Sequence, residues 1–593
     1  MPRDPRYDPL FEAVRIGPVT APNRFYQVPH CSGMGHLRPR AEAAMRAVKA
    51  EGGWGVVCTP MCEIHPSAEV APYSEARLWD DRDIPALSAM TEAVHSHGAL
   101  AGVELAYSGH AAANRFSREV SMGASHLVSD SYDPVQARAM TKRDIKAVRD
   151  WHRAAALRAR KAGFDIVYVY AGHALALPMH FIARRFNQRS DEYGGSVENR
   201  TRFLRELIED TRDAVGDTCA VAVRLAVDEL LGSEGIRADV EAREVLELLG
   251  ELPDLWDVNL SNWANDSVTS RFAPEGFQEQ HVAFVKSLTS KPVVGVGRFT
   301  TPDAMLSQVR RGVLDFIGAA RPSIADPYLP RKIDEGRGDD IRECIGCNIC
   351  VSGDFACTPM RCTQNPTMGE EWRRGWHPER VDPRGSSRGV LVVGAGPAGL
   401  ECARILGQRG YPVTLADARD GPGGRVSLES RLPGLAAWAR VRDYRVQQLR
   451  AMDNVHVYPA STMSADDVRA VGAPRVVIAT GARWRRDGVG RWHRLAVPGA
   501  QSANVYTADD VLAGTPVPDP VLIFDDDHYY LGGVIAEMLR AGGSRVTLAT
   551  PAADVSHWTH NTLEQGRIQR RLLELEVDIR THRALHALGE EGA

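Results

Sequence analysis

The sequence contains the stretch Phe164-Asp165-Ile166-Val167-Tyr168-Val169-Tyr170, a short run of mainly β-branched and aromatic residues. Such a run is typical of a parallel strand that is buried on both faces. Seven similar runs alternate with longer, helix-like stretches: Asn23–Pro29, Trp54–Thr59, Leu100–Leu105, Cys219–Leu225, Leu255–Leu260, Pro292–Gly297 and Leu314–Ala319. Eight such units over about 300 residues predict an α/β protein with an N-terminal (β/α)8 barrel. A doubly wound open sheet is the alternative.

Length and composition indicate several ordinary globular domains. The chain has 593 residues, which is more than one hydrophobic core accommodates. A net charge of −5 without a basic block argues against binding to nucleic acid. We see no apolar run long enough for a membrane span and no signal peptide, and ten cysteines in a chain of this length do not suggest a disulfide scaffold. We therefore expect a cytoplasmic protein that is independent of membranes.

Four cysteines follow the last barrel unit: Cys344, Cys347, Cys350 and Cys362. Closely spaced thiolates on a turning backbone suit an iron–sulfur cluster. The repeated two-residue spacing favours such a cluster over structural zinc, which is the alternative for the same residues. Cys357 lies in the same loop and competes with Cys362 as the fourth ligand.

A dinucleotide-binding fingerprint begins about thirty residues further on. The apolar run Gly389–Val393 leads directly into Gly394-Ala395-Gly396-Pro397-Ala398-Gly399, which opens a helix-like stretch. A second apolar run, Pro412–Ala416, ends at Asp417, where a ribose-binding acid belongs in this fold. Strand, glycines, helix and acid together predict a Rossmann-like unit that binds ADP or FAD.

A second nucleotide-type unit follows without its glycines. After the run Pro520–Phe524 stands Asp525-Asp526-Asp527-His528-Tyr529-Tyr530, and three carboxylates would repel a pyrophosphate. We interpret this unit as a scaffold. The predicted domains are a barrel (1–340), an iron–sulfur segment with a linker (341–388), an incomplete Rossmann-like ADP/FAD domain (389–515) and an incomplete, degenerate NAD-type Rossmann domain (516–593).

Functional residues in a barrel enzyme follow the carboxyl ends of the strands. Glycine and arginine after the last two strands, at Gly297, Arg298 and Arg321, predict a phosphate-binding site. The other polar or reactive side chains at or near these ends include Cys31, Glu104, Tyr170, His173, Arg224 and Asp266. The barrel mouth is therefore expected to hold a phosphate-bearing cofactor.

Several motifs resemble the trimethylamine and dimethylamine dehydrogenases, which are iron–sulfur flavoproteins related to old yellow enzyme. They are Asn23–Cys31, Asn187–Arg200, Gly318–Pro327, Cys344–Cys350 and Cys362–Glu379. The resemblance covers essentially the whole chain. It implies an amine dehydrogenase in which FMN is reduced and electrons leave through a 4Fe–4S cluster to an electron-transferring flavoprotein. We also expect a homodimer, and a chain that is truncated at its carboxyl end.

The resemblance assigns cofactor roles to single residues. Cys31 matches the cysteine that bonds covalently to FMN, and a plain buried cysteine is the alternative. Arg224 matches an arginine beside the flavin N1–O2 edge, where its charge would stabilise the reduced ring; a structural ion pair is the alternative. Glu104 matches a hydrogen-bond partner of the ring, and the phosphate-binding site would hold the FMN phosphate.

The resemblance also assigns catalytic and docking roles. Tyr170, His173 and Asp266 match the family's active-site trio, in which a carboxylate orients an imidazole against a phenol and tunes the protonation of the amine. Tyr444 matches a surface tyrosine at which the electron-transferring flavoprotein docks. The nucleotide at the glycine fingerprint would be a structural ADP or an FAD.

The expected substrate pocket departs from the family. Trp263 of the aromatic bowl that binds methylated ammonium groups is kept, but Met61 replaces a second aromatic residue. In the cysteine loop, either Phe355 restores a ring or Asp354 places a carboxylate in the pocket. A carboxylate would suit a diamine or an imidazolyl-amine. We therefore expect a secondary or functionalised amine rather than trimethylamine.

Two other functions stay open. One is an NAD(P)H-dependent 2,4-dienoyl or enoate reductase of the same superfamily, which would need an intact glycine fingerprint after Phe524. The other is a non-catalytic electron carrier, against which the retained trio argues.

Overall fold

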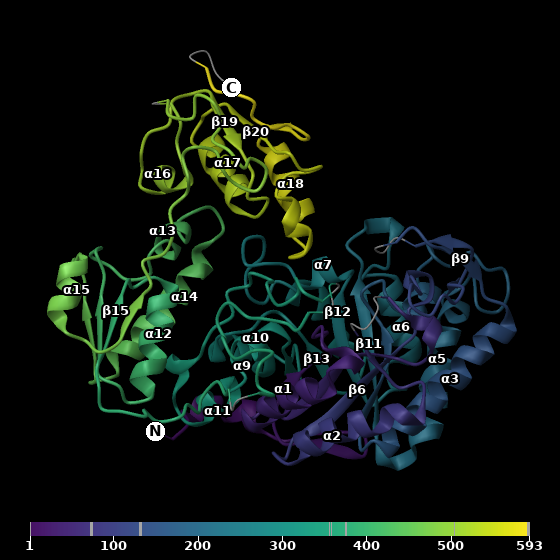
Figure 1. Ribbon diagram of the computed structural model, residues 1–593. Coiled ribbons are helices and arrows are strands. Elements are labelled where there is room, and N and C mark those ends of the chain that lie inside the picture. Colours follow the sequence, from purple (N-terminus) through teal and green to yellow (C-terminus); the bar gives the residue numbers. More distant parts are fainter. Residues whose placement is uncertain are drawn as a thin grey trace. The chain divides into compact units, whose positions relative to one another are not determined.

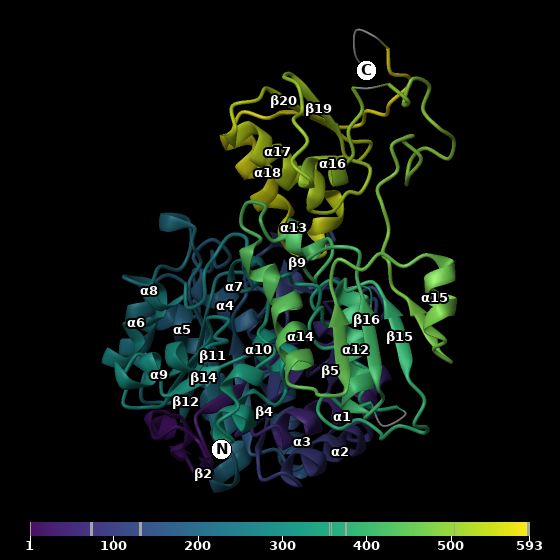
Figure 2. The same cartoon turned by 90° about the vertical axis from the view of Figure 1, so that its left-hand side faces the viewer.

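The computed structural model describes residues 2–70, 75–129, 133–354, 356, 358–373, 376–502 and 504–589. The chain forms two compact units, whose elements are labelled in Figures 1 and 2. The first contains Met1–Ser267, Pro274–Cys344 and Ile349–Glu379, and the second contains Val268–Ala273, Ile345–Asn348 and Arg380–Ala593. The finer domain boundaries at residues 340, 388 and 515 stay predictions.

The first unit contains a closed barrel of eight parallel strands. They are β3 (Phe25–Gln27), β4 (Val56–Glu63), β6 (Leu100–Ala106), β10 (Ile166–Ala171), β11 (Ala220–Asp228), β12 (Leu255–Leu260), β13 (Val293–Gly295) and β14 (Phe316–Gly318). Neighbouring strands pair in parallel, and β14 returns to pair with β3, which also pairs with β4. This closure confirms the predicted (β/α)8 barrel and excludes the open sheet. Each strand overlaps one of the predicted apolar runs.

Burial on both faces explains why these runs are so apolar. Every residue of β10 and β12 is buried. Inside the barrel the hydroxyl of Tyr168 donates to that of Tyr26 at 2.5 Å, so that two large rings fill the centre. The outer helices include α1 (Pro39–Glu51), α2 (Ile84–His95), α3 (Lys142–Lys161), α5 (Val197–Val215), α6 (Glu241–Leu249) and α9 (Pro302–Arg310). Among the described residues, no helix is long and apolar enough to cross a membrane.

A buried ion pair holds the chain that leaves the barrel. After α10 (Arg321–Ala325), Lys332 in α11 (Leu329–Asp334) places Nζ 2.8 Å from Asp326 Oδ2, and both side chains are almost fully buried. The same carboxylate oxygen accepts a hydrogen bond from the Arg342 N–H at 2.7 Å. Breaking a buried pair leaves an uncompensated charge, so this contact fixes the approach to Cys344.

The second unit contains two parallel sheets. The first, in the order β17-β16-β15-β18, consists of β15 (Val390–Val393), β16 (Val413–Ala416), β17 (Val455–Tyr458) and β18 (Val476–Ile478). Against it pack α12 (Pro397–Gln408) and, on α12, α14 (Arg440–Arg450). The second consists of β19 (Val521–Phe524), β20 (Val546–Ala549) and β21 (Asp578–Arg580), with α17 (Leu531–Ala541) and α18 (Gln565–Glu574). The predicted order of strand, glycine loop, helix and strand is confirmed.

Candidate active site

Tyr170, His173 and Asp266 meet at the carboxyl ends of β10 and β12. Tyr170 Oη lies 2.6 Å from His173 Nδ1, and His173 Nε2 lies 3.2 Å from Asp266 Oδ2; all three residues are buried. His173 has a φ of 56°, which turns the loop after β10, and it pairs with Asn262 just before α7 (Trp263–Asp266). The three residues therefore form a continuous chain of phenol, imidazole and carboxylate.

The surrounding charges determine which atoms of this phenol–imidazole–carboxylate chain carry the protons. Burial opposes ionisation of Asp266, but the hydrogen bond to His173 and the charges of His173 and Arg224 hold the pKa of Asp266 below its ordinary value. Burial raises the pKa of Tyr170 well above its ordinary value, and the charge of Glu104 adds to this shift. Asp266 therefore accepts the Nε2–H of the imidazole. Nδ1 is left as the acceptor for the phenol O–H.

Three residues of the candidate site were not singled out in the sequence. Asn259 of β12 places Nδ2 2.8 Å from His173 Nε2. Asp257 lies two residues earlier on the same strand, and Glu75 follows β4 in the chain. Asp257 and Asn259 could have been recognised in the sequence, because they are polar residues within the otherwise apolar run of β12. Glu75 carried no such signal, because no strand end or motif marks it.

Arg224 of β11 lies in a buried cluster of charges. Its Nη1 donates to Glu104 Oε1 at 3.0 Å and to the Pro29 carbonyl at 2.9 Å. Its Nε lies 3.6 Å from Asp257 Oδ2. Burial raises the pKa of Asp257 to about 7; Arg224 opposes this shift and Glu104 adds to it. Arg224 thus forms an ion pair with Glu104, as the structural alternative for this residue predicted. Its predicted role beside the flavin ring stays a prediction.

Cys31 lies beside two buried carboxyl groups. Its Sγ is 3.2 Å and 3.3 Å from the two oxygens of Glu75. The sulfur, one oxygen of Glu75 and one of Asp354 all lie within 4.8 Å of one another. Burial and the charges of Glu75 and Asp354 raise the pKa of Cys31 well above its ordinary value. Burial and the charge of Asp354 likewise raise the pKa of Glu75 well above its ordinary value.

Met61 contributes an apolar side chain beside Cys31, and the other described residues of the predicted substrate pocket lie on α7 and in the cysteine loop. Met61 is 5% exposed and packs in a cluster with Tyr170, against which Cys31 is partly buried. Trp263 is half-buried at the start of α7. Asp354 of the cysteine loop accepts a hydrogen bond from the Gly33 N–H at 3.1 Å. Phe355 lies outside the described residues.

The residues after β13 and β14 fit the phosphate of a flavin. Arg298 and Arg321 are 7% and 9% exposed. A β-carbon at Gly297 would lie 2.7 Å from the ring of Phe299, so the backbone here packs closely. Two buried guanidinium groups at neighbouring strand ends form a donor set that matches a phosphate dianion.

The cysteine segment offers a thiol donor set. Cys350 and Cys362 pack partly buried against one apolar cluster of the first unit, and Cys344 is buried. The Gln364 N–H donates to Cys362 Sγ at 3.3 Å, a kind of bond that tunes a metal-bound sulfur. Cys347 belongs to the stretch Ile345–Asn348 of the second unit. These thiol donors fit an iron–sulfur cluster. That all four cysteines bind one cluster stays a prediction. Cys357 lies outside the described residues.

The glycine loop before α12 fits a pyrophosphate. Gly394 has a φ of 103°, and a β-carbon at Gly399 would lie 1.8 Å from its carbonyl oxygen. A β-carbon at Gly396 would meet nothing within 4 Å, so space is open over the amino terminus of α12. Asp417 accepts the Ala395 N–H at 2.5 Å and lies next to this loop.

The loop after β19 is occupied by a carboxyl group. Asp525 is buried, and burial raises its pKa to about 6. Its Oδ1 accepts the His528 N–H at 3.0 Å, and a β-carbon at Gly532 would lie 2.8 Å from its carboxyl carbon. The acid fills the place where a phosphate would approach α17.

Tyr444 of α14 does not lie on the surface. It is 7% exposed, and the guanidinium carbon of Arg404 lies 5.8 Å from the centre of its ring. The expectation of a surface tyrosine is therefore wrong, because α14 turns this residue inward. Its role in docking stays a prediction that rests on the resemblance alone.

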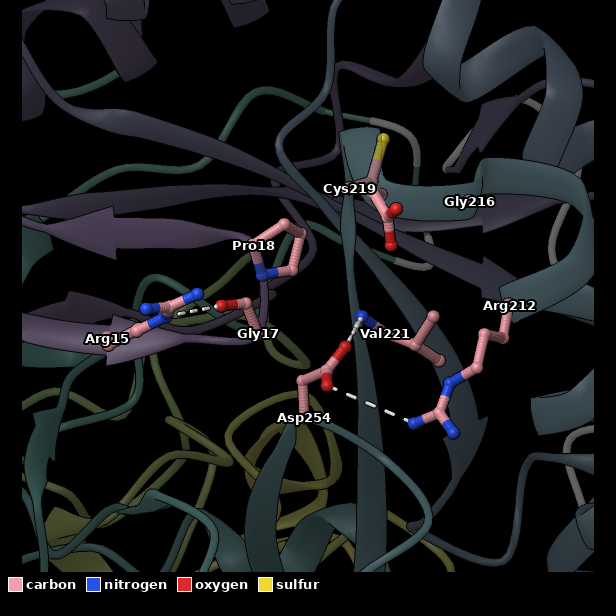
Figure 3. Close-up of a pocket in the computed structure, with 9 residues that line it drawn as sticks. Arg15, Gly17, Pro18, Arg212, Gly216, Cys219, Val221 and Asp254 are labelled. Atoms are coloured by element: carbon pink, nitrogen blue, oxygen red, sulfur yellow. Dashed lines mark hydrogen bonds and ion pairs between the residues drawn. The ribbon is translucent and has the colours of Figure 1, made fainter.

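A separate hollow of about 410 Å³ lies beside the amino ends of β11 and β12, and Figure 3 shows the side chains that line it. It is lined by Arg15, Gly17, Pro18, Arg212, Gly216, Asp217, Cys219, Val221 and Asp254. Asp254 precedes β12, and its Oδ2 accepts the N–H of Val221 near the start of β11 at 2.9 Å. Active sites of this fold lie at the carboxyl ends of the strands, so we assign this hollow a structural role.

Comparisons with known proteins agree with this geometry. Residues 9–340 match the NADH:flavin oxidoreductase / NADH oxidase family, and residues 388–588 match the pyridine nucleotide-disulphide oxidoreductases. The dimethylamine dehydrogenase of Hyphomicrobium sp. is 44% identical over 100% of this chain and 82% of its own. The structure of 6-hydroxypseudooxynicotine amine oxidase from Pseudomonas geniculata N1 has a TM-score of 0.97 and 51% identity, covering 99% and 88% of the two chains. Histamine dehydrogenase from Rhizobium sp. 4-9 has a TM-score of 0.96 and 53% identity, covering 98% and 86%.

Replacing Asp257 with asparagine tests the buried charge cluster. The pKa of Asp257 is about 7 in the folded protein and about 4 in an unfolded chain. The folded state therefore holds the proton more tightly, and wild-type stability falls as the pH rises from about 4 to about 7. Asparagine cannot ionise, so the stability of D257N relative to wild type should increase by roughly 3 kcal/mol between pH 5 and pH 8.

Urea denaturation at both pH values measures this difference. D239N is the matched control, because the Asp239 side chain is 79% exposed. Equal pH dependence of D257N and wild type would contradict the prediction.

Proposed function

The chain belongs to the NADH:flavin oxidoreductase / NADH oxidase family, and from this premise we propose that it is an FMN-dependent dehydrogenase of a functionalised amine. The observation that carries the proposal is the buried chain from Tyr170 through His173 to Asp266, beside which Glu75 and Asp354 flank Cys31. The similarity to a dimethylamine dehydrogenase, a histamine dehydrogenase and an amine oxidase supports it.

The barrel residues that would hold FMN are those at the strand ends. Arg298, Arg321 and the backbone at Gly297 would bind the phosphate, and Arg224 would supply a positive charge beside the ring. Cys31 would form the covalent bond to the ring. When bound, FMN supplies a two-electron acceptor for the C–H bond of the amine.

The phenol–imidazole–carboxylate chain would handle the amine proton. Oxidation needs the free lone pair of the nitrogen, whereas most alkylamines arrive as ammonium ions at neutral pH. The Tyr170 oxygen can accept a proton from the ammonium group while the proton of its own hydroxyl group moves to His173 Nδ1. Asp266 then stabilises the imidazolium through Nε2. The chain thus deprotonates the substrate without placing a phenolate in a buried site.

The two carboxyl groups beside Cys31 would select the substrate. Burial and the nearby carboxyl group of Asp354 both oppose ionisation of Glu75, so that its pKa lies well above its ordinary value. A cationic group between them would restore ionisation and pair with both carboxylates. A diamine or an imidazolyl-amine carries such a second cation, whereas a simple methylated amine does not.

The remaining cofactors and partners follow the family resemblance. We propose that Cys344, Cys347, Cys350 and Cys362 hold a 4Fe–4S cluster, which would take electrons from the flavin one at a time. The loop at Gly394 would bind ADP or FAD. An electron-transferring flavoprotein would be the acceptor, and the protein would be a homodimer.

A reductase that uses NAD(P)H is the second candidate. The match of residues 388–588 to the pyridine nucleotide-disulphide oxidoreductases favours it. Against it stands the buried carboxyl group of Asp525 at the loop where the pyrophosphate of NAD(P)H would bind.

Anaerobic titration of the full-length protein distinguishes the two candidates. We expect a diamine or imidazolyl-amine to bleach the flavin absorbance and NADH to leave it unchanged. Asp266→Asn should slow flavin reduction by about 100-fold near neutral pH, because the chain loses the carboxylate that stabilises the imidazolium. The difference in rate between Asp266→Asn and wild type should be smaller at high pH, where the amine reaches the site already deprotonated. Bleaching by NADH and by no amine would overturn the amine dehydrogenase.

Asp354→Asn tests the carboxyl pair. The KM for a diamine should rise by about tenfold to a hundredfold, because a charged hydrogen bond contributes about 1.5–3 kcal/mol. The KM for a monoamine of similar length should change by less than about threefold. Glu92→Gln, on the exposed face of α2, is the control. An equal rise for both amines would argue against this pocket.

Cys362→Ser tests the fourth cluster ligand. We expect the purified variant to lose most of its iron, because serine does not provide a thiolate. Iron and flavin are measured together, so that the iron-to-flavin ratio is independent of yield. Cys402→Ser, in α12, should keep its iron. Loss of iron from Cys357→Ser but not from Cys362→Ser would reverse the assignment.

A further inference from the structure

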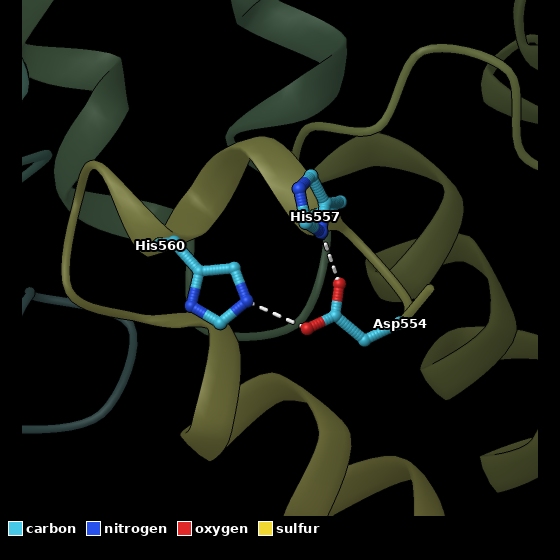
Figure 4. A group of neighbouring side chains, drawn as sticks. All are labelled: Asp554, His557 and His560. Atoms are coloured by element: carbon cyan, nitrogen blue, oxygen red, sulfur yellow. Dashed lines mark hydrogen bonds and ion pairs between the residues drawn. The ribbon is translucent and has the colours of Figure 1, made fainter. Parts of the chain in front are cut away.

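A second group of ligand-type side chains lies on the second unit, at Asp554, His557 and His560 (Figure 4). His557 Nδ1 is 2.5 Å from Asp554 Oδ1, and His560 Nε2 is 2.6 Å from Asp554 Oδ2. The three ligand atoms lie within 4.8 Å of one another. The side chains are 23%, 53% and 54% exposed in chain order. Both rings therefore face one carboxylate and remain open to solvent.

The spacing of the two histidines matches the helix that carries them, and Asp554 lies three residues before its start. They recur every third position, and η11 (His557–His560) is a 3-10 helix. Side chains at i and i+3 lie above one another in such a helix, because it has about three residues per turn. Ser556, with a φ of 50°, turns the chain into the helix just after Asp554. The His557 and His560 side chains thus lie in one row, and the turn at Ser556 brings Asp554 alongside it.

The backbone under this row is held by its buried neighbours. Val555, Ser556 and Thr559 are fully buried, and Val555 belongs to the apolar core formed with α18. The Thr559 N–H and hydroxyl donate to the Ser556 carbonyl at 2.8 Å and 2.6 Å. The Trp558 N–H donates to the His528 carbonyl at 2.8 Å. An ion bound by the outward side chains would therefore require little ordering of the backbone.

We propose that Asp554, His557 and His560 bind a divalent transition-metal ion, and that Zn²⁺ is the ion the donor set fits best. Two imidazole nitrogens and one carboxylate oxygen are common zinc ligands, and Mg²⁺ or Ca²⁺ would instead need mainly oxygen donors. Three protein ligands leave the fourth tetrahedral position to water. On binding, the proton of each neutral ring sits on its outward nitrogen, so that the facing nitrogen offers its lone pair.

This site is independent of the proposed amine chemistry. Cys31, Glu75 and Asp354 also bring ligand atoms together, but they belong to the pocket already described. The ion at Asp554 would instead link residues of the segment that connects β20 to α18. Its expected effect is a more stable second unit, because an ion that binds only the folded form shifts unfolding by mass action.

Isothermal titration of the full-length flavoprotein with ZnCl₂ tests the proposal. We expect one equivalent of Zn²⁺ that is lost, or bound at least about tenfold more weakly, in His557→Ala, His560→Ala and Asp554→Asn. Asp554→Asn nearly keeps the side-chain volume and guards against a folding failure. His586→Ala, at another exposed histidine of the second unit, is the control and should bind Zn²⁺ as wild type does.

Thermal unfolding supplies a second readout. Zn²⁺ should raise the Tm of the wild type and of His586→Ala, and it should leave the Tm of His560→Ala unchanged. Equal affinity and stoichiometry in wild type and all three ligand variants would overturn the proposal, as would a wild type that binds no Zn²⁺.

Discussion

Closure of the parallel barrel is the constraint on which the candidate active site depends. Eight strands can close only when β14 returns to pair with β3, and this pairing gathers all the carboxyl ends at one mouth. Tyr170, Asp266 and Arg224, which are far apart in the sequence, become neighbours there for that reason. The buried strands also supply a low-dielectric wall, in which each charge needs a partner.

The charges at the barrel mouth follow from this burial. Arg224 balances Glu104 and Asp257 within the strands, and its field also helps to keep Asp266 ionised. In this part of the mouth Arg224 is the counter-ion within the protein, although burial still raises the pKa of Asp257 to about 7. Beside these residues, Glu75 and Asp354 place two carboxyl groups near the thiol of Cys31, and burial together with the charge of Asp354 raises the pKa of Glu75. That part of the mouth is suited to a cationic ligand.

The second unit uses the same strand–loop–helix design twice with different outcomes. At Gly394 the glycines keep the loop clear over the start of α12. At Asp525 a buried carboxyl group occupies the corresponding position before α17. The contrast arises from side-chain chemistry alone, because both loops follow a parallel strand and precede a helix of similar length.

The sequence by itself determined the barrel and the glycine loop, and it predicted the three residues Tyr170, His173 and Asp266 that the structure brings together. Its apolar runs are long enough to mark each buried strand, and a resemblance supplied the roles at their ends. Only the tertiary structure decided which charges meet, since ion pairing depends on distances across the barrel. It joined Glu75 to Cys31 and Asp354, added Asp257 and Asn259 to the site, and turned Tyr444 inward. Spacing along a chain fixes local periodicity, but contacts between distant segments arise only when the barrel closes.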